Sequence, residues 1–197
     1  MPVVLDRFIL RPDAGHRHEI TVRAPASLVL HVARNFDMQS ISMVRAIFWL
    51  RAKLLGARTR ATPRTGLVAD MLGLGWGCLA EDPGHLFVAG AACQPWLADV
   101  VFSPIAPEKF AAYAEPDQVK IAWTLEAETL GPALSRFATD TRAVATDEQA
   151  RIKFRRYWRL FKIGIVLIRR CLLPALRREA ERQWRQSRSS AAGPSRL

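Results

Sequence analysis

A long amphipathic helix near the C-terminus is the strongest pattern in this sequence of 197 residues. At about 100° per residue, one set of its apolar side chains falls within about 40° of a single direction. These stripe residues are Phe154, Trp158, Phe161, Ile165, Ile168, Leu172 and Leu176. Asp147 is a suitable N-cap, and the helix is predicted over residues 148–186. Pro174 lacks a backbone N–H, so a kink or break is predicted between Arg170 and Leu173.

The charge of this helix limits the surroundings in which it can lie. Residues 148–197 carry 14 Lys and Arg against 3 Asp and Glu, which accounts for the whole net charge of +11. The longest apolar run, residues 163–168, has six residues and ends at Arg169 and Arg170. A membrane-spanning helix needs about 20 apolar residues, so the sequence excludes a transmembrane segment here. The apolar stripe must instead pack against another element of the protein.

The rest of the chain predicts that this other element is an antiparallel sheet. A strand is predicted over residues 16–25, helices over 25–36 and 40–55, and mainly short strands and turns over 68–145. In "VKIAWTLEAE" Trp123 belongs to an apolar face, and Lys120, Thr124, Glu126 and Glu128 form the opposite face. The two glutamates are interpreted as solvated carboxylates. The layout is α+β, and the last helix is the only predicted element long enough to cover the sheet.

This order of elements resembles the helix-grip fold of the START/Bet v 1-like superfamily, also called SRPBCC. Over roughly residues 16–182 the chain is similar to a bacterial branch of it, most closely in "FVAGAACQPW", "IAWTLEAE" and "SRFATDTRAVATDEQARIKFRRYW". The resemblance implies a curved antiparallel sheet wrapped around the long C-terminal helix, with a cavity between them for an apolar ligand. We expect a single START-like domain over residues 1–187 and a disordered polar tail over residues 188–197.

Aromatic side chains are the candidate ligand-binding residues. Trp123 lies on a predicted strand, and Phe154, Trp158 and Phe161 lie on the helix stripe. Apolar pockets commonly have aromatic walls with a few polar groups among them. The alternative interpretation is plain packing of these rings in the core between sheet and helix.

Arg142 is the candidate polar group of the same site. Its planar guanidinium suits a carboxylate or a carbonyl oxygen, and it would orient the ligand if its strand face points to the helix. Asp140 shares that face, and a surface ion pair between the two is the alternative. The competing row of the strand is more apolar, and alternation does not decide which row points inward. That row contains Phe137, Thr139, Thr141 and Ala143.

The sequence predicts binding of a small hydrophobic molecule or lipid, with no cofactor and no metal. His16 and His18 share a strand face, but no further His or Cys lies nearby in the sequence to complete a metal site. Two alternatives remain open. One is an enzyme of the polyketide cyclase/aromatase type on the same fold, for which no catalytic acid–base set is recognisable. The other is a peripheral membrane or interaction module that acts through the basic helix.

Partners and compartment follow from the charge and the cysteines. An anionic membrane surface would suit the basic residues around residues 163–167. Nucleic acid is disfavoured because no recognition motif accompanies the basic residues. The scattered Cys78, Cys93 and Cys171 and the absence of a signal-peptide pattern predict a cytoplasmic protein, peripheral to the membrane in the second alternative. No pattern specifies an oligomeric state.

Overall fold

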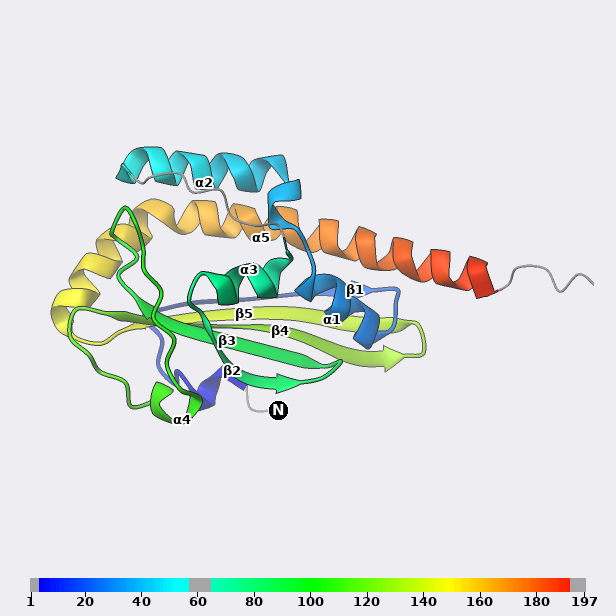
Figure 1. The fold of residues 1–197 in the computed structure, drawn as a ribbon, viewed down its shortest axis with the longest axis horizontal. Coiled ribbons are helices and arrows are strands. Elements are labelled where there is room, and N and C mark those ends of the chain that lie inside the picture. The colour runs from blue at the N-terminus through cyan, green and yellow to red at the C-terminus, as the bar shows by residue number, and fades with distance from the viewer. Residues whose placement is uncertain (1–3, 57–64, 192–197) are drawn as a thin grey trace, which may run out of the picture.

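Five antiparallel strands form a single curved sheet in the order β1-β5-β4-β3-β2 (Figure 1). The computed structural model describes residues 4–56 and 65–191. The strands are β1 (Ala14–Val22), β2 (Gly77–Asp82), β3 (Leu86–Cys93), β4 (Val119–Gly131) and β5 (Leu134–Ala145). The helices are η1 (Val4–Arg7), α1 (Ala26–Arg34), η2 (Met38–Ser40), α2 (Ser42–Leu55), α3 (Leu67–Gly73), α4 (Pro107–Phe110) and α5 (Glu148–Ala191). The expected helix-grip fold is confirmed, with a long last helix along one face of the sheet.

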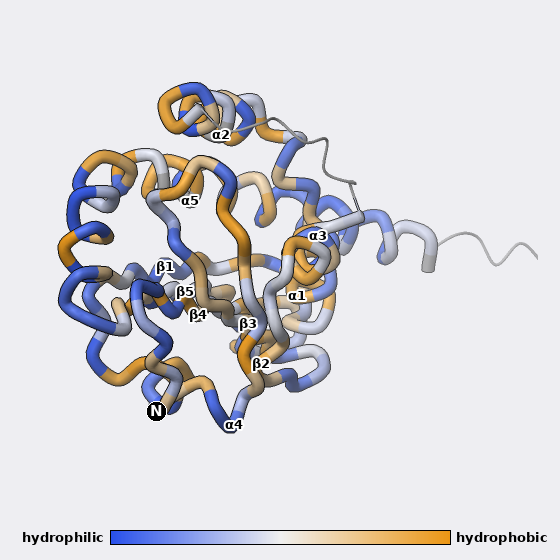
Figure 2. Tube along the Cα trace, turned by 60° about the vertical axis from the view of Figure 1, so that its left-hand side comes forward, coloured by the Kyte–Doolittle hydropathy of each residue, from blue (hydrophilic) through white to orange (hydrophobic). Residues whose placement is uncertain are grey.

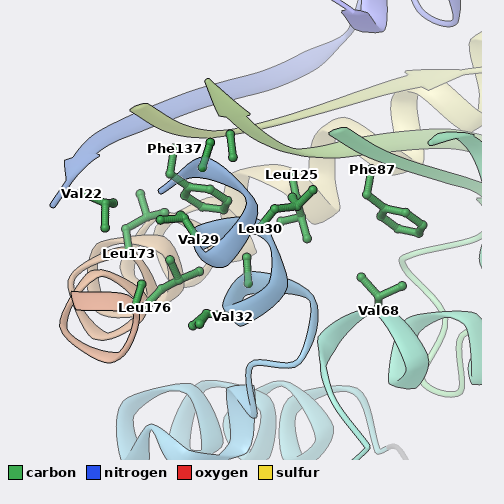
Figure 3. Close-up of a cluster of buried hydrophobic side chains, with 14 of the residues drawn as sticks. Val22, Val29, Leu30, Val32, Val68, Phe87, Leu125, Phe137, Leu173 and Leu176 are labelled. Atoms are coloured by element: carbon green, nitrogen blue, oxygen red, sulfur yellow. The ribbon is translucent and has the colours of Figure 1, made fainter. Parts of the chain in front are cut away.

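Three helices share the inner face of the sheet, which is the face toward α5. Figure 3 shows α1 beside the sheet, with α3 near one side of it and the second half of α5 near the other. Val29 and Leu30 of α1 pack in one cluster with Phe137 of the sheet and Leu173 and Leu176 of α5. The expectation that the last helix alone covers the sheet is therefore wrong, because α1 and α3 contribute to the same core.

The outer face of the sheet is covered by the N-terminal segment and α4. Leu5 and Phe110 pack there in a second cluster that includes Val88 and Ala122 of the sheet. Lys120 and Thr124 belong to the predicted polar face of β4, yet both are buried. Lys120 donates from Nζ to the carbonyl oxygens of Phe110 (3.1 Å) and Ala111 (2.9 Å) at the end of α4.

The two glutamates interpreted as solvated have specific partners on this outer face. Arg17 donates to both carboxylate oxygens of Glu126, at 3.0 and 2.9 Å. The hydroxyl of Thr124 donates to the same carboxylate at 2.6 Å. Glu128 is exposed and pairs with Arg136 at 3.1 Å. Only Glu128 therefore matches the expectation, because Glu126 takes part in a hydrogen-bond network that joins β1 and β4.

Helix α5 begins where the sequence predicts and continues past the predicted break. Asp147 accepts a hydrogen bond from the backbone N–H of Ala150 at 2.7 Å, which confirms it as the N-cap. The helix runs without interruption through Pro174 and ends at Ala191. Figure 1 shows its bend in the first turns, drawn in yellow, rather than at the proline. Residues 188–191 of the expected tail belong to this helix, and residues 192–197 lie outside the described residues.

Helix α2 lies in the layer farthest from the sheet, on the outside of α5 (Figures 1 and 2). Its predicted end and its closing glycine are confirmed, since Gly56 has the left-handed conformation with φ of 70°, and it begins two residues later than predicted, at Ser42. The segment over residues 67–73 was expected to belong to a region of strands and turns, and it is instead the short helix α3. Val68 of α3 is buried in the inner core.

Candidate ligand site between the sheet and helix α5

The predicted aromatic residues all lie on the α5 side of the sheet or on α5 itself. Trp123 is 7% exposed and lies 5.7 Å from Phe87, measured between ring centroids. Phe154 is buried beside Val119 and Ala143 in a third cluster at the start of α5. These contacts place both Phe154 and Trp123 in packed clusters on the inner face of the sheet.

Trp158 and Phe161 are partly exposed on the middle part of α5. Trp158 stacks on His16 of β1, with ring centroids 5.9 Å apart and an interplanar angle of 21°. Phe161 instead contacts Tyr157 one turn earlier, at 4.7 Å. The structure therefore brings Trp158 against the sheet, while Phe161 packs along the helix.

Arg142 lies on the outer face of the sheet, away from these aromatic residues. Its Nη1 donates to Asp6 Oδ1 at 2.6 Å and to the carbonyl oxygen of Ile9 at 2.8 Å. Its Nε lies 3.5 Å from Asp140 Oδ2. Burial raises the pKa of Asp140, and the charges of Arg142 and Arg17 oppose this rise. Arg142 thus ties the N-terminal segment to the sheet, and the row that points to α5 is the one with Phe137 and Thr141.

The middle of the inner face is accessible to solvent. Thr139 and Thr141 are partly exposed, although β5 lies inside the sheet between β1 and β4. A side chain on an interior strand can reach solvent only through the face toward which it points. Phe137 and Ala143, their inward-pointing neighbours along β5, are buried in separate clusters. An accessible space therefore lies between two packed regions of the inner face, at the level of the two threonines.

Further partly exposed side chains surround this space, which we call the inner site. The inner site comprises His16, His18, Ile121, Thr139, Thr141 and Trp158. The strand register places His16, Thr141, Trp123 and Ala89 in one row across the sheet. The threonine and alanine side chains in this row are small; Ala89 is fully buried and Thr141 is partly exposed. Sequence alternation identified these rows, but only the strand register shows which side chains are neighbours.

Two indole N–H groups add polar character beside the inner site. Trp76 and Trp123 are each 7% exposed, and their rings meet edge to face at 6.3 Å. Among the described residues, neither indole nitrogen has a hydrogen-bond partner. A buried donor without a partner costs about 1–3 kcal/mol, so an acceptor atom placed here would be favourable. Trp76 was missed in the sequence because it lies next to glycines in "GLGWG", outside any regular periodicity.

A tight turn fixes the position of Trp76. Gly75 has φ of 103°, and a Cβ there would lie 2.3 Å from the carbonyl oxygen of Phe102. Only glycine fits this backbone conformation and this close approach. The ring of Phe102 then lies 4.9 Å from that of Trp76.

Two further hollows lie elsewhere on the protein. One, of about 490 Å³, lies between the end of α1 and the second half of α5, and His31, Asp37 and Arg178 are among its lining residues. The other, of about 360 Å³, lies at the outer face, where Arg142 and Asp140 line it. Both are lined by several charged side chains, whereas the inner site contains no Asp, Glu, Lys or Arg side chain.

Neither a metal site nor a membrane span is found in the described part of the chain. No described helix is both long and apolar enough to cross a bilayer. Within residues 4–56 and 65–191, no group of three or more His, Cys, Asp or Glu side chains could hold a metal ion.

Comparisons with known proteins find similarity to solved structures, two of which align with most of the chain. No protein-family model matches the chain, and no curated protein matches it. A structural-genomics protein from Deinococcus radiodurans is 12% identical, with a TM-score of 0.30, over 77% of this chain and 99% of that one. The Zhui aromatase/cyclase from a Streptomyces species is 15% identical, with a TM-score of 0.30, over 86% of this chain and 94% of that one. The function proposed below rests on the geometry of the inner site alone.

Proposed function

We propose that the protein binds a small hydrophobic molecule or lipid in the inner site, between the sheet and α5. The partial exposure of Thr139 and Thr141 carries this proposal, because interior-strand side chains of a solidly packed core would be buried. Trp158 on one side and Ile121 on the sheet supply apolar surface. Burial of that surface contributes about 25 cal/mol for each Å² removed from water.

Neutral donors would orient the ligand. The hydroxyl groups of Thr139 and Thr141 and the indole N–H of Trp123 can all donate to an oxygen atom. None of these donors carries a charge, which favours a carbonyl, ester or hydroxyl oxygen over a carboxylate. Arg142 has no part in this proposal, because it is held on the outer face by Asp6 and Ile9.

The histidines favour a second candidate function, that of a cyclase/aromatase-like enzyme. His16 and His18 belong to the inner site, with ring centroids 6.3 Å apart. Imidazole exchanges protons near neutral pH, so these side chains could move protons on a bound polyketide-like chain. The enzyme and the carrier share the same binding space and differ in what happens to the ligand.

Native mass spectrometry of the purified protein tests the binding proposal. We expect a bound apolar molecule that solvent extraction releases, and a rise in Tm when that molecule is added back. The variant Thr141→Leu fills the inner site and should weaken binding at least about tenfold, or 1.4 kcal/mol. Thr21→Leu is the matched control, since Thr21 is exposed on the other face of β1. Equal binding by both variants would contradict the location.

The two candidate functions are separated by following the extracted molecule. If the protein is a carrier, the molecule keeps its mass after incubation with fresh protein. If it is an enzyme, a product accumulates, and His16→Gln or His18→Gln lowers the rate of its formation by a larger factor than it weakens binding.

A further inference from the structure

The outer pair of helices, α2 and the middle of α5, exposes an unusual amount of apolar surface. Trp49 is 59% exposed, Leu160 is 65% exposed and Ile163 is 64% exposed, so these side chains lie largely in solvent. The exposed large apolar residues of this pair are Met43, Trp49, Leu50, Leu54, Leu160, Ile163 and Leu167, and we call all of them except Trp49 the outer apolar face. Figure 2 shows that α2 carries apolar residues although it lies outside the rest of the fold.

The two helices run antiparallel and in close contact. A Cβ on Gly164 would lie 3.1 Å from Ile47 Cγ2, so α2 approaches α5 at this glycine. Tyr157 precedes Gly164 by seven residues on α5, and Arg51 follows Ile47 by four residues on α2. The hydroxyl oxygen of Tyr157 lies 3.4 Å from Arg51 Nε. The residue numbers therefore rise in opposite directions along the contact.

Except for Trp49, the exposed apolar residues of both helices lie on one side of this pair. Trp49 lies about 100–140° from the other exposed apolar residues of α2, on the side of α2 away from α5. At about 100° per residue, Met43, Leu50 and Leu54 lie within about 40° of one another, beside the contact residue Ile47. Leu160, Ile163 and Leu167 lie within about 60° of one another on α5, beside Gly164 and away from the sheet. Both helices are right-handed and antiparallel, so these two rows face the same side and form one continuous surface.

Basic side chains border the outer apolar face and no acidic side chain interrupts it. The sequence has no Asp or Glu over residues 38–69 or over residues 149–178. Arg156, Arg159 and Arg170 are exposed next to the α5 row. Among the described residues, none of these three arginines forms an ion pair, although the arginine at position 151 does.

We propose that the outer apolar face docks on the surface of an anionic lipid bilayer. An interfacial helix buries its apolar side chains about 5–10 Å deep, while Lys and Arg at its edge contact anionic headgroups. Each Lys or Arg near such a surface contributes about 1 kcal/mol. Trp49, with Lys53 Nζ 5.1 Å from the centre of its ring, has the amphipathic character of residues at the membrane–water interface. A charged lipid surface is favoured over a second copy of the chain because two such basic rims would repel each other.

This inference is independent of the inner site and is tested with vesicles. The full chain is sedimented with phosphatidylcholine vesicles that contain or lack phosphatidylglycerol. We expect at least about tenfold stronger binding to the anionic vesicles, and a loss of that binding as salt screens the charges. Vesicles with brominated acyl chains should quench the tryptophan fluorescence, and Trp49→Phe should remove part of that quenching.

Matched variants distinguish the contribution of the apolar side chains to vesicle binding from that of the basic side chains. Leu160→Gln with Ile163→Gln should abolish binding, whereas Leu130→Gln with Leu134→Gln should leave it unchanged, since Leu130 and Leu134 are exposed at the far end of β4 and β5. Arg156→Gln with Arg159→Gln should weaken binding at least about tenfold. Arg185→Gln with Arg188→Gln removes the same charge from the end of the same helix and should have a smaller effect.

Three results would overturn the proposal. The first is equal vesicle binding by the double variant Leu160→Gln with Ile163→Gln and the double variant Leu130→Gln with Leu134→Gln. The second is a dimer in sedimentation equilibrium that Leu160→Gln with Ile163→Gln converts to monomer, without any vesicle binding. The third is binding to duplex DNA, and not to vesicles, that depends on Arg156 and Arg159. The inner site can remain functional in every one of these cases.

Discussion

Asp140 and Asp147 are two acidic side chains whose surroundings shift their pKa values in opposite directions. Burial raises the pKa of Asp140 above its ordinary value of 3.8, against the opposing charges of Arg142 and Arg17. Hydrogen bonds from the backbone N–H groups of Ala150 and Asp117 lower the pKa of Asp147 below the same value. Asp140 therefore contributes stability that is present at low pH and lost as pH rises through its raised pKa. Asp147 contributes stability that is present above 3.8 and lost as pH falls through its lowered pKa.

The free energy of unfolding in urea, measured between about pH 3 and pH 7, should show these opposite signs. As pH rises, Asp140→Asn should become more stable relative to the wild type, because it lacks the buried charge. Over the same range Asp147→Asn should become less stable relative to the wild type. If the stabilities of the two variants, relative to the wild type, changed with pH in the same direction, these causes of the two pKa shifts would be contradicted.

Single residues of the candidate site were predictable only in part. Trp123 and Trp158 follow from periodicity, because alternation on a strand and the stripe on a helix both mark the side chains that meet in the core. The position of Arg142 does not follow from periodicity, since either row of side chains on β5 could be the inward one in an alternating pattern. The choice depends on the segment around Asp6 and Ile9, more than a hundred residues away, which covers the outer face. No local pattern carries that information.

At the scale of elements, tertiary packing explains where the sequence was misleading. Helix α3 has seven residues, too few to be stable alone, and packing of Val68 in the core maintains it. Helix α5 continues through Pro174 because Leu173, Leu176 and Ala180, on both sides of the proline, are buried against the rest of the fold. In contrast, the long amphipathic pattern of α5 and the cap at Asp147 are local, and both were predicted correctly.

The contact between α2 and α5 depends on the missing side chain of Gly164. Gly164→Leu should push α2 away, because even a Cβ would lie 3.1 Å from Ile47. We expect faster hydrogen exchange across α2, with little change in the sheet, because few residues of α2 are buried. Gly73→Leu is the control, since no atom lies within 4 Å of a Cβ at this other helical glycine. If hydrogen exchange in α2 is the same in the Gly164→Leu variant and the wild type, the prediction is wrong and the contact between α2 and α5 does not depend on Gly164.

At the scale of the whole molecule, residues 4–10 complete the fold by covering the outer face. Leu5 is fully buried between the sheet and α4, whereas Leu10 is 71% exposed. Leu5→Ala should therefore lower the free energy of unfolding by about 2–5 kcal/mol. Leu10→Ala should change it by less than about 0.5 kcal/mol. Chemical denaturation of the two variants checks this difference, and similar values would mean that the N-terminal segment contributes little to stability.

The pairing of the first strand with the last has a consequence for how the chain folds. β1 pairs along its whole length with β5, so Ala14 lies opposite Ala143. During synthesis β1 leaves the ribosome long before its partner exists, and β5 must then insert between β1 and β4. Contacts between such distant residues require closure of a long loop, which slows folding. The nascent chain thus carries an unpaired β1 until residues 134–145 have been synthesised, and during this interval the edge of β1 is open to pairing with other chains.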